Sequence, residues 1–577
     1  MTPGRRTLFT IVWVAFALAA CAYDAPGVGD AGPEPPLSAS VPATAETLGL
    51  LNPSHFANAV GTPADNPNFP DFPQGPLTSN VPHDVDNLFL IQNQDVEVRQ
   101  RLFDILSWQT FLALAWPLDE EGRAQPNLTD SGAPAWTTWK PSAALFRNGG
   151  LDPGPWDASA PAPANPCAEG RAQLANLDVI STDRPNLLET ATQADAMKLW
   201  DQNGNLVYYE ILLDKPEFDY IREEGLYSLD GQVSFLLNHT RPYFPTGKYL
   251  DSSGQKKSAD PALAGVIELK LAWKVIDEER DLAERFYTES ACLLNEQGRW
   301  EQRLVGLVGM HIAHRTFSAA QWLWATFEQI DNTQVDVLAV QEYADKGQVL
   351  RPSFFNPDCQ TCPPNTITVR DGISRTQVAP VVEGPTSVQA LNQQVQQRLK
   401  DVGSVWQYYR LIGTQWPPDP GSGGPPQPVP AVLANPVMET YVPADDASCM
   451  NCHYGAAMAA TITAQANGGE QVAWGPPGSA DFSYLLMKAH AQTLVCSIDA
   501  AAAAPVVAEL PQAGAEQPIG PQALLPSELR ACHVTLSAQA TIANLTLGGA
   551  TVWRIDDEQH GYMIREADGA LSIYRDR

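Results

Sequence analysis

The stretch Ile267-Glu-Leu-Lys-Leu-Ala-Trp-Lys-Val275 decides the fold of the central part of the chain. Its large apolar residues alternate with Glu268, Lys270, Ala272 and Lys274. Successive side chains of a β-strand point to opposite faces of the sheet. The alternation therefore predicts a half-buried strand, with one face in the core and the other toward solvent.

Further strands are expected on both sides of this stretch. Val207–Leu213 is a second run of strand-forming residues, and Asn203-Gly204 before it is typical of a hairpin turn. The runs 286–294 and 303–312 flank the turn-forming residues 295–298 and predict an antiparallel hairpin. The middle of the chain is therefore expected to contain an antiparallel sheet.

Helices are expected around this sheet. A helical spacing of apolar residues begins near Asn93 and stops at Trp116-Pro117, and Ser318 is placed to cap a helix that reaches Ile330. A third helix is expected over 391–411. Sheet and helices together predict an α+β domain over 89–415.

The N-terminus has the features of an export signal. Arg5 and Arg6 precede the apolar run Leu8–Ala20, which is shorter than the roughly 20 residues that a membrane span needs. Leu18-Ala-Ala-Cys21 resembles the lipobox of bacterial lipoproteins. The resemblance implies that residues 1–20 are a signal peptide and that Cys21 becomes the lipid anchor. The alternative is an ordinary cleaved signal with an incidental cysteine.

The composition and net charge of the chain limit the classes of molecule that it is expected to bind. The chain has 577 residues, is 44% hydrophobic and 18% charged, and carries a formal net charge of −30. This charge argues against nucleic acid, whose binding needs a basic surface. It suits either an inert acidic surface or the attraction of a basic protein partner. Residues 21–88, rich in Pro, Ala and Gly, are expected to form a tether.

The motif Cys449-Met-Asn-Cys452-His453 follows a Pro/Gly-rich linker expected over 416–434. Two thiols three positions apart can each bond one vinyl group of a single haem, and the adjacent histidine then lies at the iron. The alternative is a disulfide or zinc pair with an incidental histidine. The expected export of the chain favours the haem interpretation of the motif, because c-type haem is attached outside the cytoplasm.

The motif resembles that of the c-type cytochromes, and the chain as a whole resembles large bacterial lipoproteins with a C-terminal C-x-x-C-H site. The resemblance implies one covalent haem c, with Cys449 and Cys452 as thioether residues and His453 as proximal iron ligand. It also implies a mostly helical, cytochrome c-like domain over 435–577. Helices are expected at 456–464 and 482–494, with a short β-hairpin tail drawn from 552–555, 562–565 and 571–575.

The ligand on the other side of the iron has several candidates. Met487 and His490 are three positions apart and share a face of the expected helix 482–494. His311 lies far upstream in an apolar run that also contains His314; in a strand these two histidines point to opposite faces. The alternatives are a core methionine, a solvated histidine and histidines satisfied inside the core.

Nine cysteines are present, so eight remain if Cys21 is lipidated. Cys359 and Cys362 have the C-x-x-C spacing, but Pro363 stands where a haem-binding histidine would be. They are expected to form a disulfide, with a redox pair or a metal pair as alternatives. Cys167 with Cys292 and Cys496 with Cys532 are candidate pairs, although spacing alone cannot decide connectivity.

Two functions are therefore expected from the sequence. The first is electron transfer by a monohaem c-type cytochrome, lipid-anchored at the periplasmic side of the envelope and serving a periplasmic redox protein. Ala22 after the anchor favours the outer membrane over the inner by resemblance to lipoprotein sorting. The second is a haem-dependent oxidoreductase or small-molecule sensor, with an open distal site covered by the α+β region. Whether the chain is an enzyme stays open, because no hydrolase or nucleotide-binding motif is present.

Overall fold

The computed structural model of the chain describes its residues in segments. The described residues are 50–51, 71–73, 75–85, 95–157, 167, 197–246, 264–295, 300–316, 318–319, 321–335, 337–359, 361–380, 386–418, 425–442, 446–464, 470–492, 494–499, 517–518, 540–547, 550–556, 562–567 and 570–575. Within these segments no helix is long and apolar enough to cross a bilayer. The expected signal peptide, the expected anchor Cys21 and most of the expected tether lie outside the described residues.

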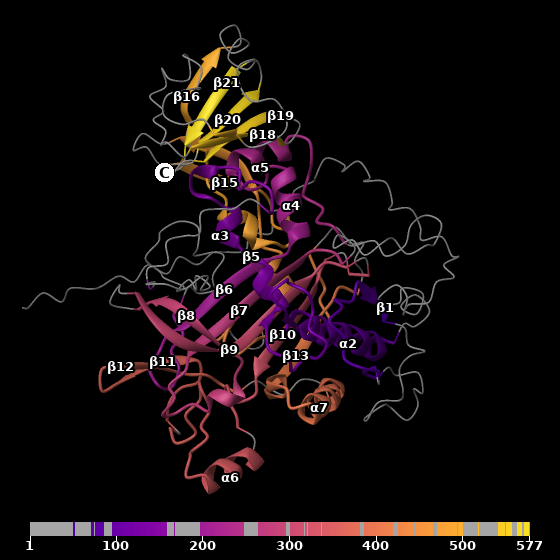
Figure 1. The fold of residues 1–577 in the computed structure, drawn as a ribbon, viewed down its shortest axis with the longest axis vertical. Helices are drawn as coiled ribbons and strands as arrows, with labels where there is room; N and C mark the ends of the chain where they lie inside the picture. The colour runs from indigo at the N-terminus through magenta and orange to yellow at the C-terminus, as the bar shows by residue number, and fades with distance from the viewer. Residues whose placement is uncertain are drawn as a thin grey trace, which may run out of the picture. The chain divides into compact units, whose positions relative to one another are not determined.

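A seven-stranded antiparallel sheet is the centre of the fold (Figure 1). Its order is β13-β10-β9-β7-β6-β5, and β8 also pairs with β9. Its strands are β5 (Lys140–Pro141), β6 (Val207–Leu213), β7 (Ile267–Val275), β8 (Thr288–Leu294), β9 (Trp300–His314), β10 (Leu323–Gln329) and β13 (Tyr409–Gln415). The expected strands β6 and β7 and the expected β8–β9 hairpin are therefore present.

One face of this sheet packs against two helices, α2 (Val96–Leu114) and α7 (Thr386–Asp401). The apolar side chains of β7, β9 and β10 share a core with the buried faces of these helices. Phe327 of β10 stacks on Phe111 of α2 at 4.4 Å between ring centroids and meets Trp108 at 5.0 Å. The large apolar residues that alternate along β7 are therefore the ones that enter this core.

The other face of the sheet is covered as well, so the prediction that β7 is half-buried is wrong. Only Lys270 among the residues of β7 is partly exposed. Lys274 is 1% exposed and pairs with Asp281, with 2.5 Å between Nζ and Oδ1. A buried charge is tolerated when it is paired, and the alternation did not reveal these partners because Asp281 and Asp201 lie outside the strand.

The C-terminal region is mostly β-structure, and the prediction of a mostly helical, cytochrome c-like domain is wrong. A six-stranded antiparallel sheet has the order β16-β21-β20-β19-β18-β17. Its strands are β16 (Leu494–Asp499), β17 (Gln517–Pro518), β18 (Thr541–Leu547), β19 (Ala550–Asp556), β20 (Tyr562–Ala567) and β21 (Ala570–Arg575). The three expected tail strands belong to this sheet.

Two expected helices near the motif are absent from the described structure. The segment expected as helix 456–464 contains the strand β14 (Ala459–Ala464), which pairs with β15 (Glu470–Trp474). In the segment expected as helix 482–494, Tyr484–Lys488 forms a 3-10 turn, η8, and Leu494 begins strand β16. Phe482 has φ 71°, in the left-handed region, and a helix cannot begin through that conformation.

The expected helix from Ser318 to Ile330 is also wrong, since Leu323–Gln329 forms β10. This segment lies between β9 and β13 and hydrogen-bonds to both, so strand pairing overrides its helical spacing. The helix expected over 391–411 ends earlier, because α7 stops at Asp401. A 3-10 turn, η7 (Val405–Tyr408), then leads into β13.

The remaining elements are short. The helical ones are η3 (Ala135–Thr138), α3 (Ser142–Leu145), η4 (Asn148–Gly150), α4 (Lys215–Glu223), α5 (Leu229–Leu236), η6 (Ala283–Arg285), α6 (Val337–Asp345) and α8 (Cys449–His453). The strands are β1 (Leu50–Leu51), β2 (Asp84–Val85), β3 (Pro117–Leu118), β4 (Ala133–Pro134), β11 (Thr366–Arg370) and β12 (Ile373–Gln377).

Candidate functional site

The C-x-x-C-H motif forms the single helical turn α8, which is attached to the end of strand β13. Ser448 caps the turn, since its Oγ accepts a hydrogen bond from Asn451 N at 3.3 Å. Gln415, the last residue of β13, accepts a hydrogen bond from Met450 N at 3.1 Å. The Met450 side chain is fully buried, so the turn is held by packing as well as by hydrogen bonds.

Both cysteines of the motif are present as thiols. Cys449 is partly buried and Cys452 is exposed. Burial raises the pKa of the Cys449 thiol, and the nearby Glu439 raises it further. The Cys449 thiol is therefore protonated at neutral pH and needs no counter-charge.

Four other cysteines form disulfides. Cys167 is disulfide-bonded to Cys292, and Cys359 to Cys362. The candidate pair Cys496 with Cys532 cannot be followed, because Cys532 lies outside the described residues.

His453 is held in one tautomer by the backbone. Its Nδ1 lies 2.9 Å from the carbonyl oxygen of Phe482. A carbonyl oxygen only accepts, so Nδ1 carries the proton and Nε2 keeps its lone pair. Burial lowers the pKa of His453 to about 4, which keeps the ring neutral at pH 7. A neutral imidazole with its second nitrogen fixed by a carbonyl is the form that binds metals.

Two aromatic rings orient the same imidazole. Trp324 of β10 lies 4.2 Å from the His453 ring centroid, and Tyr484 of η8 lies 5.1 Å from it. The Tyr484 hydroxyl also donates to the carbonyl oxygen of Cys452 at 2.8 Å. The imidazole is therefore positioned by the large sheet on one side and by η8 on the other.

The Phe482 carbonyl is positioned by an unusual turn. Asp481 and Phe482 have φ 49° and 71°, in the left-handed region that favours glycine. The Asp481 carboxylate forms a buried ion pair with Arg315, just after β9. Trp322 Nε1 donates to the Asp481 carbonyl oxygen at 3.0 Å. These two contacts stabilise the strained backbone that points a carbonyl at His453.

A cluster of charged groups on the large sheet lies beside the motif. Lys270 of β7 and His311 of β9 are directly opposite each other in the strand register. His311 Nε2 is 3.4 Å from Glu439 Oε2, yet this buried nitrogen makes no hydrogen bond. Burial lowers the pKa of Lys270, while Glu439 and, when they are ionised, Cys452 and Cys449 raise it. The cluster is therefore close enough to both cysteines to interact with them electrostatically once a thiol is ionised.

The three candidate distal ligands lie in different surroundings in the structure. His311 is among the groups that influence the pKa of His453. Met487 is buried in η8. His490 pairs through its backbone with α5, since its carbonyl oxygen accepts from Leu229 N at 3.1 Å. The sequence could not single out His311, because only the register of β7, β9 and β10 brings it near the motif.

His314 is not part of this cluster. It occupies the opposite face of β9, as the alternation predicts, and its Nε2 lies 2.5 Å from the carbonyl oxygen of Ala264. Burial lowers the pKa of His314 to about 4. Its second nitrogen, Nδ1, is buried without a hydrogen-bond partner. His314 is therefore a neutral core histidine.

The lowered pKa of His314 predicts a pH effect on stability. The unfolded chain protonates this histidine near pH 6.5 and the folded chain only near pH 4. Between these values only the unfolded state gains the proton, so stability falls by about 1.4 kcal/mol per pH unit on acidification. We expect His314→Gln to flatten urea-unfolding free energies measured from pH 6.5 to 4, and the exposed His239→Gln to keep the slope. Equal slopes in all three proteins would contradict this assignment.

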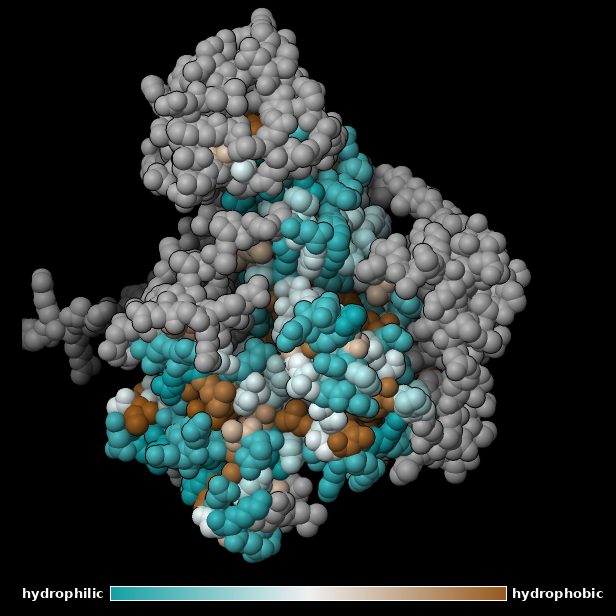
Figure 2. Space-filling model, in the orientation of Figure 1, coloured by the Kyte–Doolittle hydropathy of each residue, from teal (hydrophilic) through white to brown (hydrophobic). Residues whose placement is uncertain are grey.

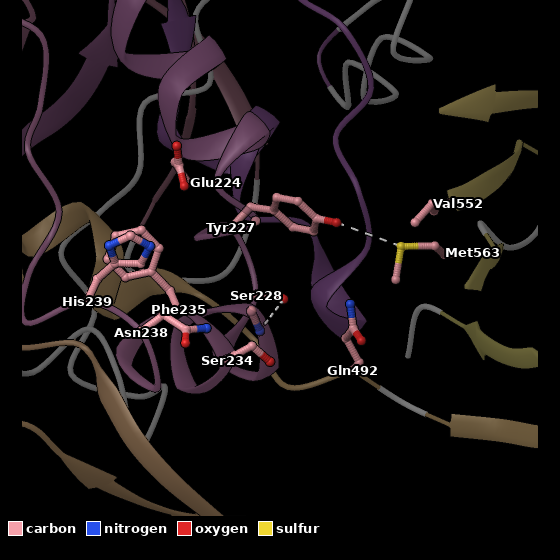
Figure 3. Close-up of a pocket in the computed structure, with 12 residues that line it drawn as sticks. Glu224, Tyr227, Ser228, Ser234, Phe235, Asn238, His239, Gln492, Val552 and Met563 are labelled. Carbon is pink, nitrogen blue, oxygen red and sulfur yellow. Dashed lines mark hydrogen bonds between the residues drawn. The ribbon is translucent and has the colours of Figure 1, made fainter. Parts of the chain in front are cut away.

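A cavity of about 240 Å³ lies at the C-terminal sheet, away from the motif. It is bordered by α5, by Gln492 and by the strand residues Val552 and Met563 (Figure 3). In Figure 3 the Tyr227 hydroxyl points across it toward Met563 Sδ, at 3.8 Å. None of the three motif residues lines this cavity.

The donor set fits haem better than a bare metal ion. Within the described segments, no three His, Cys, Asp or Glu side chains are grouped to hold a metal ion. Covalent haem needs only two thiols and one neutral imidazole from the protein. The chain matches no protein-family model, no curated protein and no solved structure. The function is therefore argued from the chemistry of these residues.

Proposed function

We propose that this chain is an exported lipoprotein that carries one covalent haem c and transfers electrons at the periplasmic side of the cell envelope. The observation that carries the proposal is the His453 imidazole, which is neutral, fixed in one tautomer and adjacent in sequence to the thiols of Cys449 and Cys452. Cys449 and Cys452 would hold the haem by thioether bonds. When bound, the haem would supply one-electron redox chemistry.

The surrounding residues have defined tasks in this proposal. The Phe482 carbonyl keeps the His453 proton on Nδ1, so that Nε2 can bind iron. Trp324 and Tyr484 restrict the rotation of the ring. The net charge of −30 suits a basic redox protein as partner. Cys21 would attach the chain to the membrane, with the outer membrane favoured.

A second function is favoured by the cluster of Lys270, His311 and Glu439. Acid–base groups beside a haem can move protons to and from a bound small molecule. His311 Nε2 lies 3.4 Å from Glu439 Oε2, so this imidazole and carboxylate could exchange a proton beside a bound small molecule. If the iron keeps an open position, the chain would be a haem-dependent oxidoreductase or a small-molecule sensor.

An absorption spectrum of the exported full-length protein tests both functions. It should be recorded oxidised and reduced, with and without carbon monoxide. Sharp low-spin bands that ignore carbon monoxide mean two protein ligands and support electron transfer. High-spin iron that binds carbon monoxide means an open site and supports the second function. The absence of covalent haem would overturn both.

His311 would be the second protein ligand of the iron that the electron-transfer proposal favours. We expect His311→Ala to convert a low-spin spectrum to a high-spin one that responds to carbon monoxide, because the iron would lose a protein ligand. His490→Ala is the matched control and should keep the low-spin bands. If instead His490→Ala or Met487→Leu opened the site and His311→Ala did not, the distal ligand would belong to the segment around η8.

A further inference from the structure

The disulfide Cys359–Cys362 lies on the surface, in the loop that precedes the hairpin of β11 and β12. Both cysteines are partly exposed, and the neighbouring Asp358, Thr361 and Pro363 are exposed. In the second described disulfide, Cys167 is partly exposed but Cys292 is only 2% exposed on strand β8. A thiol from another protein could therefore reach both sulfurs of the first disulfide, whereas one sulfur of the second is buried.

This disulfide also contributes little to constraining the chain. Its cysteines are 3 positions apart, whereas those of Cys167–Cys292 are 125 apart. A cross-link restricts the unfolded chain more as the loop that it closes becomes longer. The short loop therefore gives Cys359–Cys362 a small structural role, and both cysteines could be reduced without loss of the fold.

A cation is placed beside one of the two sulfurs. Arg370, the last residue of β11, has Nη2 at 3.9 Å from Cys359 Sγ. A guanidinium at this position stabilises negative charge on the sulfur. In thiol–disulfide exchange the sulfur that leaves as a thiolate departs faster when its charge is stabilised. Arg370 thus makes Cys359 the leaving sulfur and Cys362 the sulfur that is attacked.

The hairpin next to the disulfide has features of a contact surface. Val369 and Ile373 are 68% and 40% exposed at its tip. Figure 2 shows a hydrophobic area amid hydrophilic surface where Figure 1 places β11 and β12. The base of the hairpin is fixed, because Gln202 Nε2 donates to the Thr376 carbonyl oxygen at 2.7 Å. Ile373 is the cross-strand partner of Arg370 and lies on the same face of the hairpin, while Val369 lies on the other face. A protein partner that contacts Ile373 would therefore approach the face of the hairpin that carries Arg370.

We propose that Cys359–Cys362 is a redox-active disulfide that accepts two electrons from a protein dithiol. The partner's thiolate attacks Cys362 Sγ, the Sγ–Sγ bond breaks, and Cys359 leaves as a thiolate beside Arg370. The partner's second thiolate then attacks the partner sulfur of the mixed disulfide and releases Cys362. The partner becomes a disulfide and its two protons end on Cys359 and Cys362. This activity is independent of the proposed haem.

The test uses the full exported chain with reduced thioredoxin as the probe dithiol, regenerated by its reductase and NADPH. New thiols are alkylated at timed intervals and located by mass spectrometry, with Cys167–Cys292 as the internal control. We expect Cys359 and Cys362 to be modified at least about tenfold faster than Cys167 and Cys292. A thioredoxin without its second cysteine should be trapped on Cys362.

Two matched variants test the role of the cation. Arg370→Gln should slow the reduction by roughly threefold or more, because the leaving thiolate loses its counter-charge. Arg351→Gln is the control, since Arg351 is an exposed arginine of the same region that pairs with Asp358 at 3.5 Å. Reduction no faster than that of Cys167–Cys292, trapping on Cys359, or an unchanged rate in Arg370→Gln would each overturn the proposal as stated.

Discussion

Replacing Cys449 and Cys452 together by serine is expected to leave the exported protein without any covalently bound haem. Serine keeps the size and polarity of the two side chains but cannot form thioether bonds to the haem vinyl groups. The capped turn α8 does not depend on the sulfurs, because Ser448 and Gln415 hold its backbone. Haem that survives denaturing electrophoresis is the measurement, and the fold can be checked by circular dichroism.

The chain contains its own control for this experiment. Cys359 and Cys362 have the same C-x-x-C spacing, but no histidine follows them. The double variant Cys359→Ser, Cys362→Ser should retain the full amount of covalent haem. Haem that persists after the loss of Cys449 and Cys452, or that is lost with Cys359 and Cys362, would show that the site is misassigned.

Replacing Arg315 by methionine is expected to destabilise the protein by about 3–5 kcal/mol, since it leaves a buried carboxylate without its partner. Asp481 is 1% exposed, and burial raises its pKa while Arg315 lowers it. The loss should also disturb the haem spectrum, because the Asp481–Phe482 turn points the carbonyl that orients His453. Urea unfolding and the absorption spectrum measure the two effects.

Two further variants distinguish the effect of the unpaired buried carboxylate on stability from the effect of losing any arginine. Arg303→Met removes an exposed arginine whose partner Glu301 is 3.7 Å away, and it should change stability by less than about 1 kcal/mol. Adding Asp481→Asn to Arg315→Met removes the unpaired charge and should recover part of the lost stability. If the double variant were no more stable than Arg315→Met alone, the buried charge would not be the cause.

The strand predictions were correct where the local sequence pattern and the position of the segment in the folded sheet favour the same element. Val207–Leu213 and Ile267–Val275 have the expected bounds, because the first is rich in β-branched and aromatic residues and the second alternates between apolar and polar residues. The prediction was wrong at Leu323–Gln329, whose apolar spacing also fits a helix. Pairing with β9 and β13 decided that segment, and a single sequence does not contain the position of those neighbours.

The prediction of a mostly helical domain around the motif was wrong for a different reason. The C-x-x-C-H spacing specifies how haem can be attached, but it carries no information on the fold that surrounds it. Ala459–Ala464 is rich in alanine and threonine, and its small residues suit a helix or an edge hairpin equally in isolation. The pairing with β15 and the left-handed turn at Phe482 made the region mostly β.

The sequence by itself determined what is local: two thiols and an imidazole within the five residues Cys449–His453. Only the tertiary structure decided which distant groups accompany them. It placed Lys270, His311 and Glu439 beside the motif, directed the Phe482 carbonyl to His453 and put His314 in the core. The physical reason is that contacts between residues far apart in the chain depend on strand register and burial, which no local spacing specifies.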